Sequence, residues 1–327
     1  MIPRMRRSPQ IVKSAARAVA ARICEATPWL ARRLEGKALV LMYHRVLPPE
    51  DAAAMCVQPG MYVTPQTFDR HLRFLRTHFE LLSFTELLRR WRGGTWNDSA
   101  RSCVLTFDDG WVDNYRYAFP LLLAYDAPAT IFLPTELIGT AGWPWPDRLG
   151  YLLHRSLLDR RAAAVDVDLV IERAKAWPDT ARERVIRALA ADAGIQLPRS
   201  RCFLDWEEVR EMGRHGVEFG SHTSTHAILT RLDRAALEVE LKRPHETLAS
   251  RCDQYLPVLC YPNGDHSEEV VTAARAAGYL AAVTTNPGVE SRRPDDLFRL
   301  RRVGLHEDVA RTVPLLALHL ARQACRS

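Results

Sequence analysis

Two short stretches of the chain carry residues that could do chemistry. Thr106-Phe107-Asp108-Asp109-Gly110 ends an apolar run in two adjacent carboxylates and a glycine, and Gly220-Ser221-His222-Thr223-Ser224-Thr225-His226 holds two histidines. Neighbouring side chains on an extended strand point opposite ways, so one acid can meet a cation while the other stays free. Imidazoles at this spacing lie on one face of a helical turn, or bracket a strand-to-helix turn, and can close on one metal ion.

The elements around these stretches must deliver them to one place. Short apolar runs alternate with helical patterns, which is the signature of parallel strands with helical crossovers. The expected strands are residues 38–45, 81–84, 104–107, 129–134, 217–220, 257–260, 279–284 and 297–303. In parallel α/β sheets and barrels, functional groups sit at the carboxyl ends of strands, where the acids, the histidines and His44 all fall.

Other segments are expected to be helical. Thr85 is predicted to cap a helix through Trp91, and residues 309–322 to form one closing helix. Residues 143–201 depart from the strand and helix alternation and are predicted to be a helical insertion, either a lid or a structural cap. Trp143 and Trp145 there could stack on sugar rings or only pack. The remaining histidines, His71 among them, are expected to be surface or capping residues.

Composition limits the class of protein. The chain has 327 residues, 47% of them hydrophobic, so it can bury a large core, and an α/β barrel of this length can be one domain. Its seven cysteines are scattered without a CxxC pair, which favours reduced thiols of a cytoplasmic protein. No stretch approaches the roughly 20 apolar residues of a membrane span.

The positive charge belongs to one arm. Residues 1–40 hold nine Lys or Arg against Glu25 and Glu35, a balance of +7, so the total of +6 leaves about −1 for the rest. This distribution argues against a nucleic-acid surface on the main body. Ile11, Ala15, Val19 and Ile23 recur every fourth residue and predict a basic amphipathic helix. Charged residues interrupt it too often for a secretory signal, so it either packs on the body or contacts anionic lipid through residues 1–35.

The residues quoted so far, with Asp205-Trp206 and Tyr261-Pro262-Asn263-Gly264, resemble in order and spacing the motif series of the polysaccharide deacetylases, the chitin deacetylase-like carbohydrate esterases. The resemblance runs from about Leu39 to Val303. It implies a distorted (β/α)7 barrel over residues 38–304, interrupted by the insertion, with the basic arm (1–37) before it and a C-terminal helix (305–327) after it.

The resemblance also implies roles. Asp109, His222 and His226 would bind a divalent metal, zinc or cobalt, Asp108 would be the general base, and the Tyr261 backbone N–H would stabilise the oxyanion. Three protein ligands would leave positions open for water and an acyl oxygen.

Two positions depart from the chitin deacetylase pattern. The arginine that orients the base is missing before Tyr261, so the chain resembles the exopolysaccharide-linked branch instead. The histidine of the Leu-x-x-His motif has only an approximate counterpart in His306, so His44 and His306 are both candidates for the general acid.

These features predict a metal-dependent hydrolase that removes an N-acetyl group from an amino sugar of a polysaccharide or a lipid-linked saccharide. We expect it in the cytoplasm, with peripheral contact at the inner face of the membrane if the arm binds lipid. A deformylase or other linear amide hydrolase acting on a sugar carrier is the alternative with the same chemistry. A metal-binding or glycan-binding protein without turnover is the alternative from another class.

Overall fold

The computed structural model describes residues 32–160, 166–198 and 200–325. Seven parallel strands close into a barrel, because β1 pairs with β10 on one side and with β5 on the other. Around the barrel they are β1 (Ala38–Tyr43), β10 (Leu300–Gly304), β9 (Ala281–Pro287), β8 (Tyr255–Cys260), β7 (Glu218–Ser221), β6 (Ala129–Leu133) and β5 (Ser102–Phe107). The prediction of a (β/α)7 barrel is therefore confirmed. The short β4 (Glu80–Leu81) pairs with the start of β5, and β2 (Arg45–Val46) pairs with β3 (Tyr62–Val63) outside the barrel.

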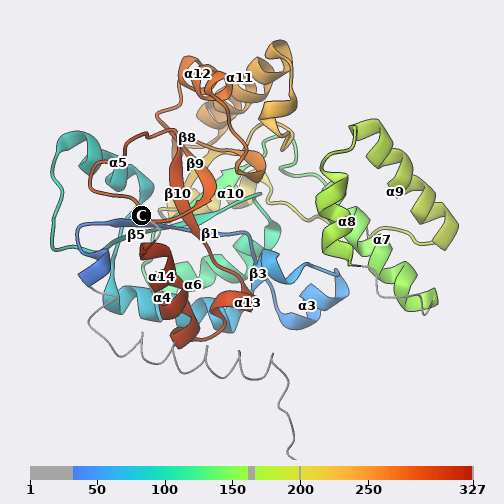
Figure 1. Ribbon diagram of the computed structural model, residues 1–327, viewed down its shortest axis with the longest axis horizontal. Coiled ribbons are helices and arrows are strands. Elements are labelled where there is room, and N and C mark those ends of the chain that lie inside the picture. The colour runs from blue at the N-terminus through green and yellow to red at the C-terminus, as the bar shows by residue number, and fades with distance from the viewer. Residues whose placement is uncertain (1–31, 161–165, 199, 326–327) are drawn as a thin grey trace, which may run out of the picture.

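Helices cover the outside of the barrel (Figure 1). They are α4 (Pro65–His78), α6 (Phe119–Ala124), α10 (Trp206–Arg214), α11 (Arg234–Arg251), α12 (Glu268–Ala276), α13 (Glu307–Ala310) and α14 (Val313–Ala324), with α3 (Pro49–Ala54) near the rim. The strands show the alternation that a barrel requires. Val40 and Val104 belong to the apolar cluster inside, whereas Leu39 and Leu105 belong to the cluster beneath the helices.

Helix α5 (Phe84–Gly93) closes the amino-terminal end of the barrel. Its residues Leu87 and Leu88 join the interior cluster. Glu218, the first residue of β7, is buried and accepts the backbone N–H of Phe84 at 2.9 Å. A buried carboxylate at a helix start satisfies a free N–H and complements the helix dipole. With this end closed by α5, the opposite rim is the one left for chemistry.

Two predicted helix boundaries were wrong. Helix α5 begins at Phe84, because the Ser83 hydroxyl accepts the Glu86 N–H at 3.2 Å and caps the helix two residues before Thr85. The expected closing helix is divided into α13 and α14, because Thr312 caps a new helix by accepting the Leu315 N–H. For α5 the capping hydroxyl precedes the expected cap, and for α14 it lies inside the expected helix. In both cases it meets an unpaired N–H group of the first turn.

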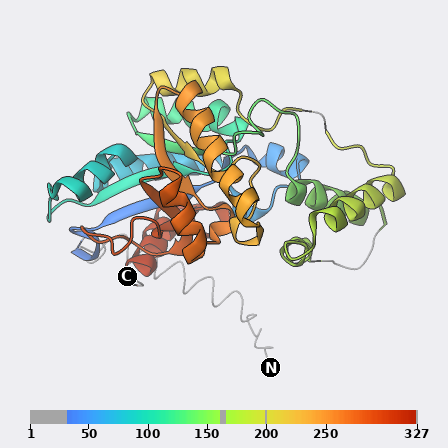
Figure 2. The same cartoon turned by 90° about the horizontal axis from the view of Figure 1, so that it is seen from above.

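The predicted insertion consists of α7 (Trp145–Arg160), α8 (Val167–Ala174) and α9 (Asp179–Ala193). It has its own small core, which includes Leu152, Ile171 and Ile186. In Figures 1 and 2 it lies to one side of the barrel, apart from the helices that cover the strands. Trp143 is only 8% exposed and packs edge-on against Tyr151 with ring centroids 5.6 Å apart, which favours the packing role for this residue.

Three further expectations concern the basic helix, the cysteines and membrane-spanning segments. The basic helix falls within residues 1–31, which lie outside the described residues, although Leu34 after it is buried in the core. The six described cysteines are all free thiols, and Cys24 falls in the undescribed arm. None of the described helices is long and apolar enough to cross a bilayer.

His71 is not a surface residue, contrary to the expectation. It is fully buried on α4, with Nδ1 3.0 Å from the Tyr43 hydroxyl and Nε2 2.7 Å from the Ala310 carbonyl oxygen. The sequence pattern missed this because both partners are distant along the chain. Burial lowers the pKa of His71 to about 4, against the hydrogen bond to Ala310.

This shift predicts a pH-dependent loss of stability. Because the folded pKa lies below the unfolded value, the contribution of His71 is complete above the unfolded pKa of about 6.5 and is lost as the pH falls toward 4. We expect wild type to lose about 2 kcal/mol of unfolding free energy between pH 7 and 5 through this group, and His71→Gln to lack that part. Urea unfolding at both pH values measures it, with His78→Gln as control. An identical pH slope in the His71 variant would contradict the assignment.

Candidate active site

The carboxyl ends of the strands bring the predicted residues together. Asp108 and Asp109 follow β5, and His222 follows β7. Non-glycine residues with positive φ concentrate at this rim. Of the six described, Asp109 (72°), Thr223 (67°) and His226 (66°) lie in these two loops, and Asn263 (60°) lies in the turn after β8. Such backbone is costly, and it persists where the surrounding structure enforces a special geometry.

Asp109, His222 and His226 form a group that could hold a metal ion. Asp109 Oδ1 lies 3.3 Å from Nε2 of His222 and 3.2 Å from Nε2 of His226. Ligands about 2.0 to 2.1 Å from a tetrahedral zinc ion would be separated by about 3.3 Å. The Asp109 oxygen therefore has this spacing from each of the two nitrogens, and all three donor atoms lie within 4.8 Å of one another.

The electrostatics of this group also fit a cation. Burial would raise the pKa of Asp109, but hydrogen bonds with His222 and His226 hold it well below its usual value. Burial would lower the pKa of His226, but Asp109 raises it above its usual value. His222 donates its Nδ1–H to the Cys260 carbonyl at 2.8 Å, which leaves Nε2 for the ion and fixes the ring.

Asp108 is held by a residue that the motif search missed. Arg302 on β10 is fully buried inside the barrel and donates from Nη1 and Nη2 to the two oxygens of Asp108, both at 2.7 Å. Its Nε donates to the Thr284 carbonyl at 2.8 Å. Burial would raise the pKa of Asp108, but the charge and hydrogen bonds of Arg302 bring it below its usual value. An arginine from another strand thus does what the missing one was expected to do.

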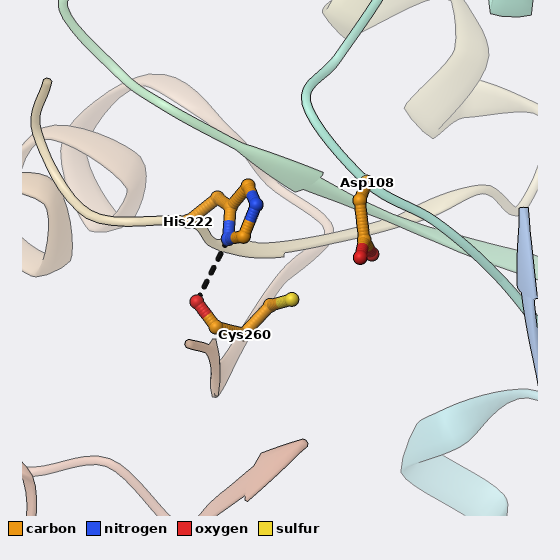
Figure 3. A group of neighbouring side chains, drawn as sticks. All are labelled: Asp108, His222 and Cys260. Carbon is orange, nitrogen blue, oxygen red and sulfur yellow. Dashed lines mark hydrogen bonds between the residues drawn. The ribbon is translucent and has the colours of Figure 1, made fainter. Parts of the chain in front are cut away.

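Asp108, His222 and Cys260 form a second group with metal-ligand chemistry, shown in Figure 3. The Arg302 guanidinium already satisfies this group, because its Nη2 lies 3.2 Å from Cys260 Sγ and also binds Asp108. A second cation would have to displace a buried, paired one. Of the two groups, the Asp109 group is therefore the better candidate for a metal site.

The loop that carries the two histidines is held from behind by Glu240 of α11. The carboxylate is 8% exposed and accepts the backbone N–H groups of Ser224 at 2.8 Å and Thr225 at 3.0 Å. It also accepts the Thr225 hydroxyl at 2.8 Å. A buried acid with three donors is fixed in place, so it fixes the loop between His222 and His226.

The two candidates for the general acid, His44 and His306, lie at different places on the rim. His44 Nε2 is 3.9 Å from Asp108 Oδ2, and its imidazole is 21% exposed. His306 is the N-cap residue immediately before α13, and its Nδ1 has no hydrogen-bond partner within the described chain, with Asp308 Oδ2 3.9 Å away. Burial lowers the pKa of His306, and the charge of nearby His44 lowers it further, against Asp308.

The oxyanion role expected of Tyr261 stays a prediction, and its polar groups have partners in this structure. Its backbone N–H donates to the Val283 carbonyl at 3.2 Å, and its hydroxyl donates to the Phe298 carbonyl at 3.0 Å. The ladder between β8 and β9 continues one residue beyond the end of β8 and uses this N–H. To serve an oxyanion, the Tyr261 N–H would therefore have to leave this hydrogen bond.

The insertion contacts the rim at two separated points. From the α8 region, Asp168 accepts the side-chain N–H of Gln58 at 2.6 Å, and Lys175 donates to Asn263 Oδ1 at 2.8 Å. Gln58 belongs to the loop before β3, and Asn263 to the turn after β8. The insertion therefore contacts the rim near the site through these two hydrogen bonds.

Sequence reasoning missed Arg302 and Glu240, which hold the predicted residues. A signal existed for Arg302, since it shares the alternation phase of Leu300, which packs inside the barrel. An arginine at an inward position requires a buried anion as partner. No comparable signal marks Glu240, one of many acids on an ordinary helix.

Comparison with known proteins agrees with this geometry. The family model described as polysaccharide deacetylase matches residues 96–282, more than half of the chain. The protein YxkH of Bacillus subtilis (strain 168), whose name places it among the polysaccharide deacetylases, is 23% identical over 280 residues, which cover 85% of this chain and 75% of that protein.

Two solved structures share the fold. The deacetylase PplD of Streptococcus pyogenes, in complex with acetate, has a TM-score of 0.59 and 22% identity, covering 86% of this chain and 97% of its own. IcaB from Ammonifex degensii has a TM-score of 0.58 and 18% identity, covering 88% and 97%. With the matched motifs gathered on one rim of a seven-stranded barrel, the chain belongs to the polysaccharide deacetylase family and is a hydrolase of that type.

Proposed function

We propose that the protein removes an N-acetyl group from an amino sugar of a polysaccharide or lipid-linked saccharide, with a divalent metal, zinc or cobalt, held by Asp109, His222 and His226. One observation carries the proposal: a carboxylate oxygen that lies 3.2 to 3.3 Å from each of two imidazole nitrogens is next to a second carboxylate that an arginine keeps ionised. An ion bound there would supply Lewis acidity toward the amide carbonyl and lower the pKa of water.

The protein groups have separate tasks. Asp108 accepts the proton of the attacking water, and Arg302 keeps it anionic and aimed at the site. Amide cleavage also requires a proton on the departing amine. His44 is the better placed donor, because its Nε2 lies 3.9 Å from Asp108 Oδ2, so both proton-transfer groups lie close together.

Substituting each histidine distinguishes the two donors. We expect His44→Gln to lower kcat by about 100-fold or more, the usual effect of losing a general acid. His306→Gln should change kcat less, because burial and the charge of His44 disfavour its protonated form. Steady-state kinetics of both variants on one substrate decide the matter, and the reverse order of effects would assign the acid to His306.

The choice between acetyl and formyl substrates is tested by the released acid. We expect acetate from N-acetylglucosamine oligomers when zinc or cobalt is added, and loss of release when a chelator removes the metal. The acetate in the related PplD structure supports an acetyl group. Formate release from a formylated sugar carrier, without acetate, would favour a deformylase. Metal uptake without release of any acyl group would show a binding protein without turnover. That alternative was suggested by the missing arginine, and the pairing of Asp108 with Arg302 removes this reason for it.

We propose that the basic arm holds the protein at the inner face of the membrane, where a lipid-linked saccharide would be the substrate. The support is the charge of +7 on residues 1–40. Vesicles with anionic lipid should recover the full chain better than a chain without residues 1–31. The deletion ends there because Leu34 is buried in the core. Equal recovery would remove the proposal.

A further inference from the structure

Asp109 uses its two oxygens differently. Oδ1 faces both histidines, whereas Oδ2 accepts a hydrogen bond from the Trp111 indole N–H at 2.9 Å. The carboxylate is 8% exposed, so this indole replaces water as the partner of the second oxygen. A neutral donor satisfies Oδ2 while leaving the negative charge of the ligand intact.

The Trp111 ring is held by planar groups. The Arg45 guanidinium carbon lies 4.1 Å from the ring centroid, and the Phe203 ring stacks at 5.1 Å with an interplanar angle of 19°. The backbone around Trp111 and Phe203 also holds the two rings together. Residues 111 and 203 form an antiparallel bridge, and Leu204 donates its N–H to the Gly110 carbonyl at 2.8 Å. The segment after the insertion is thereby fastened to the loop that carries the acids.

Arg45 is itself fixed. It is 2% exposed, and both Nε and Nη2 lie 2.8 Å from Asp113 Oδ2, while Asp113 Oδ1 accepts the Val46 N–H at 2.9 Å. A guanidinium that is paired this way keeps its plane, and stacking on an aromatic ring orients that ring. A rigid series of contacts therefore runs from Asp113 through Arg45 and Trp111 to the metal-ligand candidate Asp109.

We infer that Trp111, held against Arg45 and Phe203, is a positioning residue that keeps Asp109 a one-oxygen ligand of the metal. The inference rests on the proposed function. If Oδ2 were free, the carboxylate could turn and bind through both oxygens, which would fill a coordination position that substrate and water need. Partners of metal ligands orient them in this way and tune metal affinity. Trp111 does not need to touch the substrate to have this effect.

Trp111→Phe tests the inference, because it keeps an aromatic ring in the stack and removes the N–H together with the second ring of the indole. Chelator-treated protein is titrated with Co²⁺ and followed by visible absorption. We expect the dissociation constant to rise about tenfold, as for lost partners of metal ligands. We also expect weaker absorption per bound ion, since four-coordinate Co²⁺ absorbs more strongly than ions of higher coordination number. Trp91→Phe is the matched control, because the Trp91 indole N–H is buried without a partner among the described residues.

The outcomes are distinct. Wild-type affinity and spectrum in Trp111→Phe would overturn the inference while leaving the proposed function intact. Failure of the wild type to bind Co²⁺ would overturn the proposed function, and this inference with it. If Trp111→Phe does not fold, Phe203→Leu loosens the stack without removing the N–H and should also weaken Co²⁺ binding. An unchanged dissociation constant in that variant would overturn the inference.

Discussion

Asp108→Asn is expected to lower kcat by about 100-fold to 10,000-fold, the range for loss of a general base, while metal binding is retained. The amide keeps the size of the carboxylate but cannot take a proton from water. Metal binding should persist because the donor atoms of the proposed site belong to Asp109, His222 and His226. Acetate release and Co²⁺ titration on the same sample measure the two effects.

Asp109→Asn is the control for this experiment, since it changes the adjacent acid in the same way. It should weaken metal binding, because an amide oxygen is a poorer ligand and carries no charge to hold the ion. The two variants therefore separate loss of turnover from loss of metal. Substantial turnover in Asp108→Asn would show that another group takes the proton, and loss of metal there would place Asp108 among the ligands.

Arg302→Met is expected to have the largest effect on stability. Removing one partner of a buried ion pair leaves the other charge unpaired and typically costs about 3 to 5 kcal/mol. Arg302 is fully buried and binds Asp108 through two nitrogens, so little water can replace it. Activity should fall as well, because Asp108 loses both its orientation and the charge that keeps it ionised. Urea unfolding and acetate release measure the two losses.

The pH dependence of this loss has a defined sign. In wild type the pKa of Asp108 is lowered, so the pair stabilises the fold above the unfolded pKa, and the stabilisation is lost as the pH falls through the folded pKa. Without Arg302, burial alone acts and raises the pKa of Asp108. The variant should therefore be most destabilised, relative to wild type, at neutral pH and less so in acid, where Asp108 is protonated.

The double variant Asp108→Asn/Arg302→Met tests whether the two effects share one cause. It no longer contains an unpaired buried charge, so it should be more stable than Arg302→Met alone. If the losses of the two single variants simply add, the pair does not couple and Arg302 stabilises the barrel by packing only. Arg302→Lys keeps the charge but cannot bind both oxygens in one plane, so it should recover stability better than activity.

Much of this active site could be predicted from the sequence, because its physical basis is local. Each βα unit places the residues that follow its strand on the same rim. Asp108, Asp109 and His222 each come directly after an apolar run, so the sequence already predicts that they lie on this rim. The residue types then indicate a cation with nitrogen and oxygen ligands. Likewise, residues 143–201 showed by their lack of strands that they are an insertion.

Only the tertiary structure decided how those groups are held. Arg302 and Asp108 lie 194 positions apart, and Glu240 binds the histidine loop from a separate helix. The Tyr261 N–H is bound by a neighbouring strand. Such contacts depend on which strands become neighbours when the barrel closes and which way each side chain faces, and no local pattern encodes that. Local sequence patterns thus identify the reactive residues, whereas the charge, orientation and supporting partners of these residues depend on the closed fold.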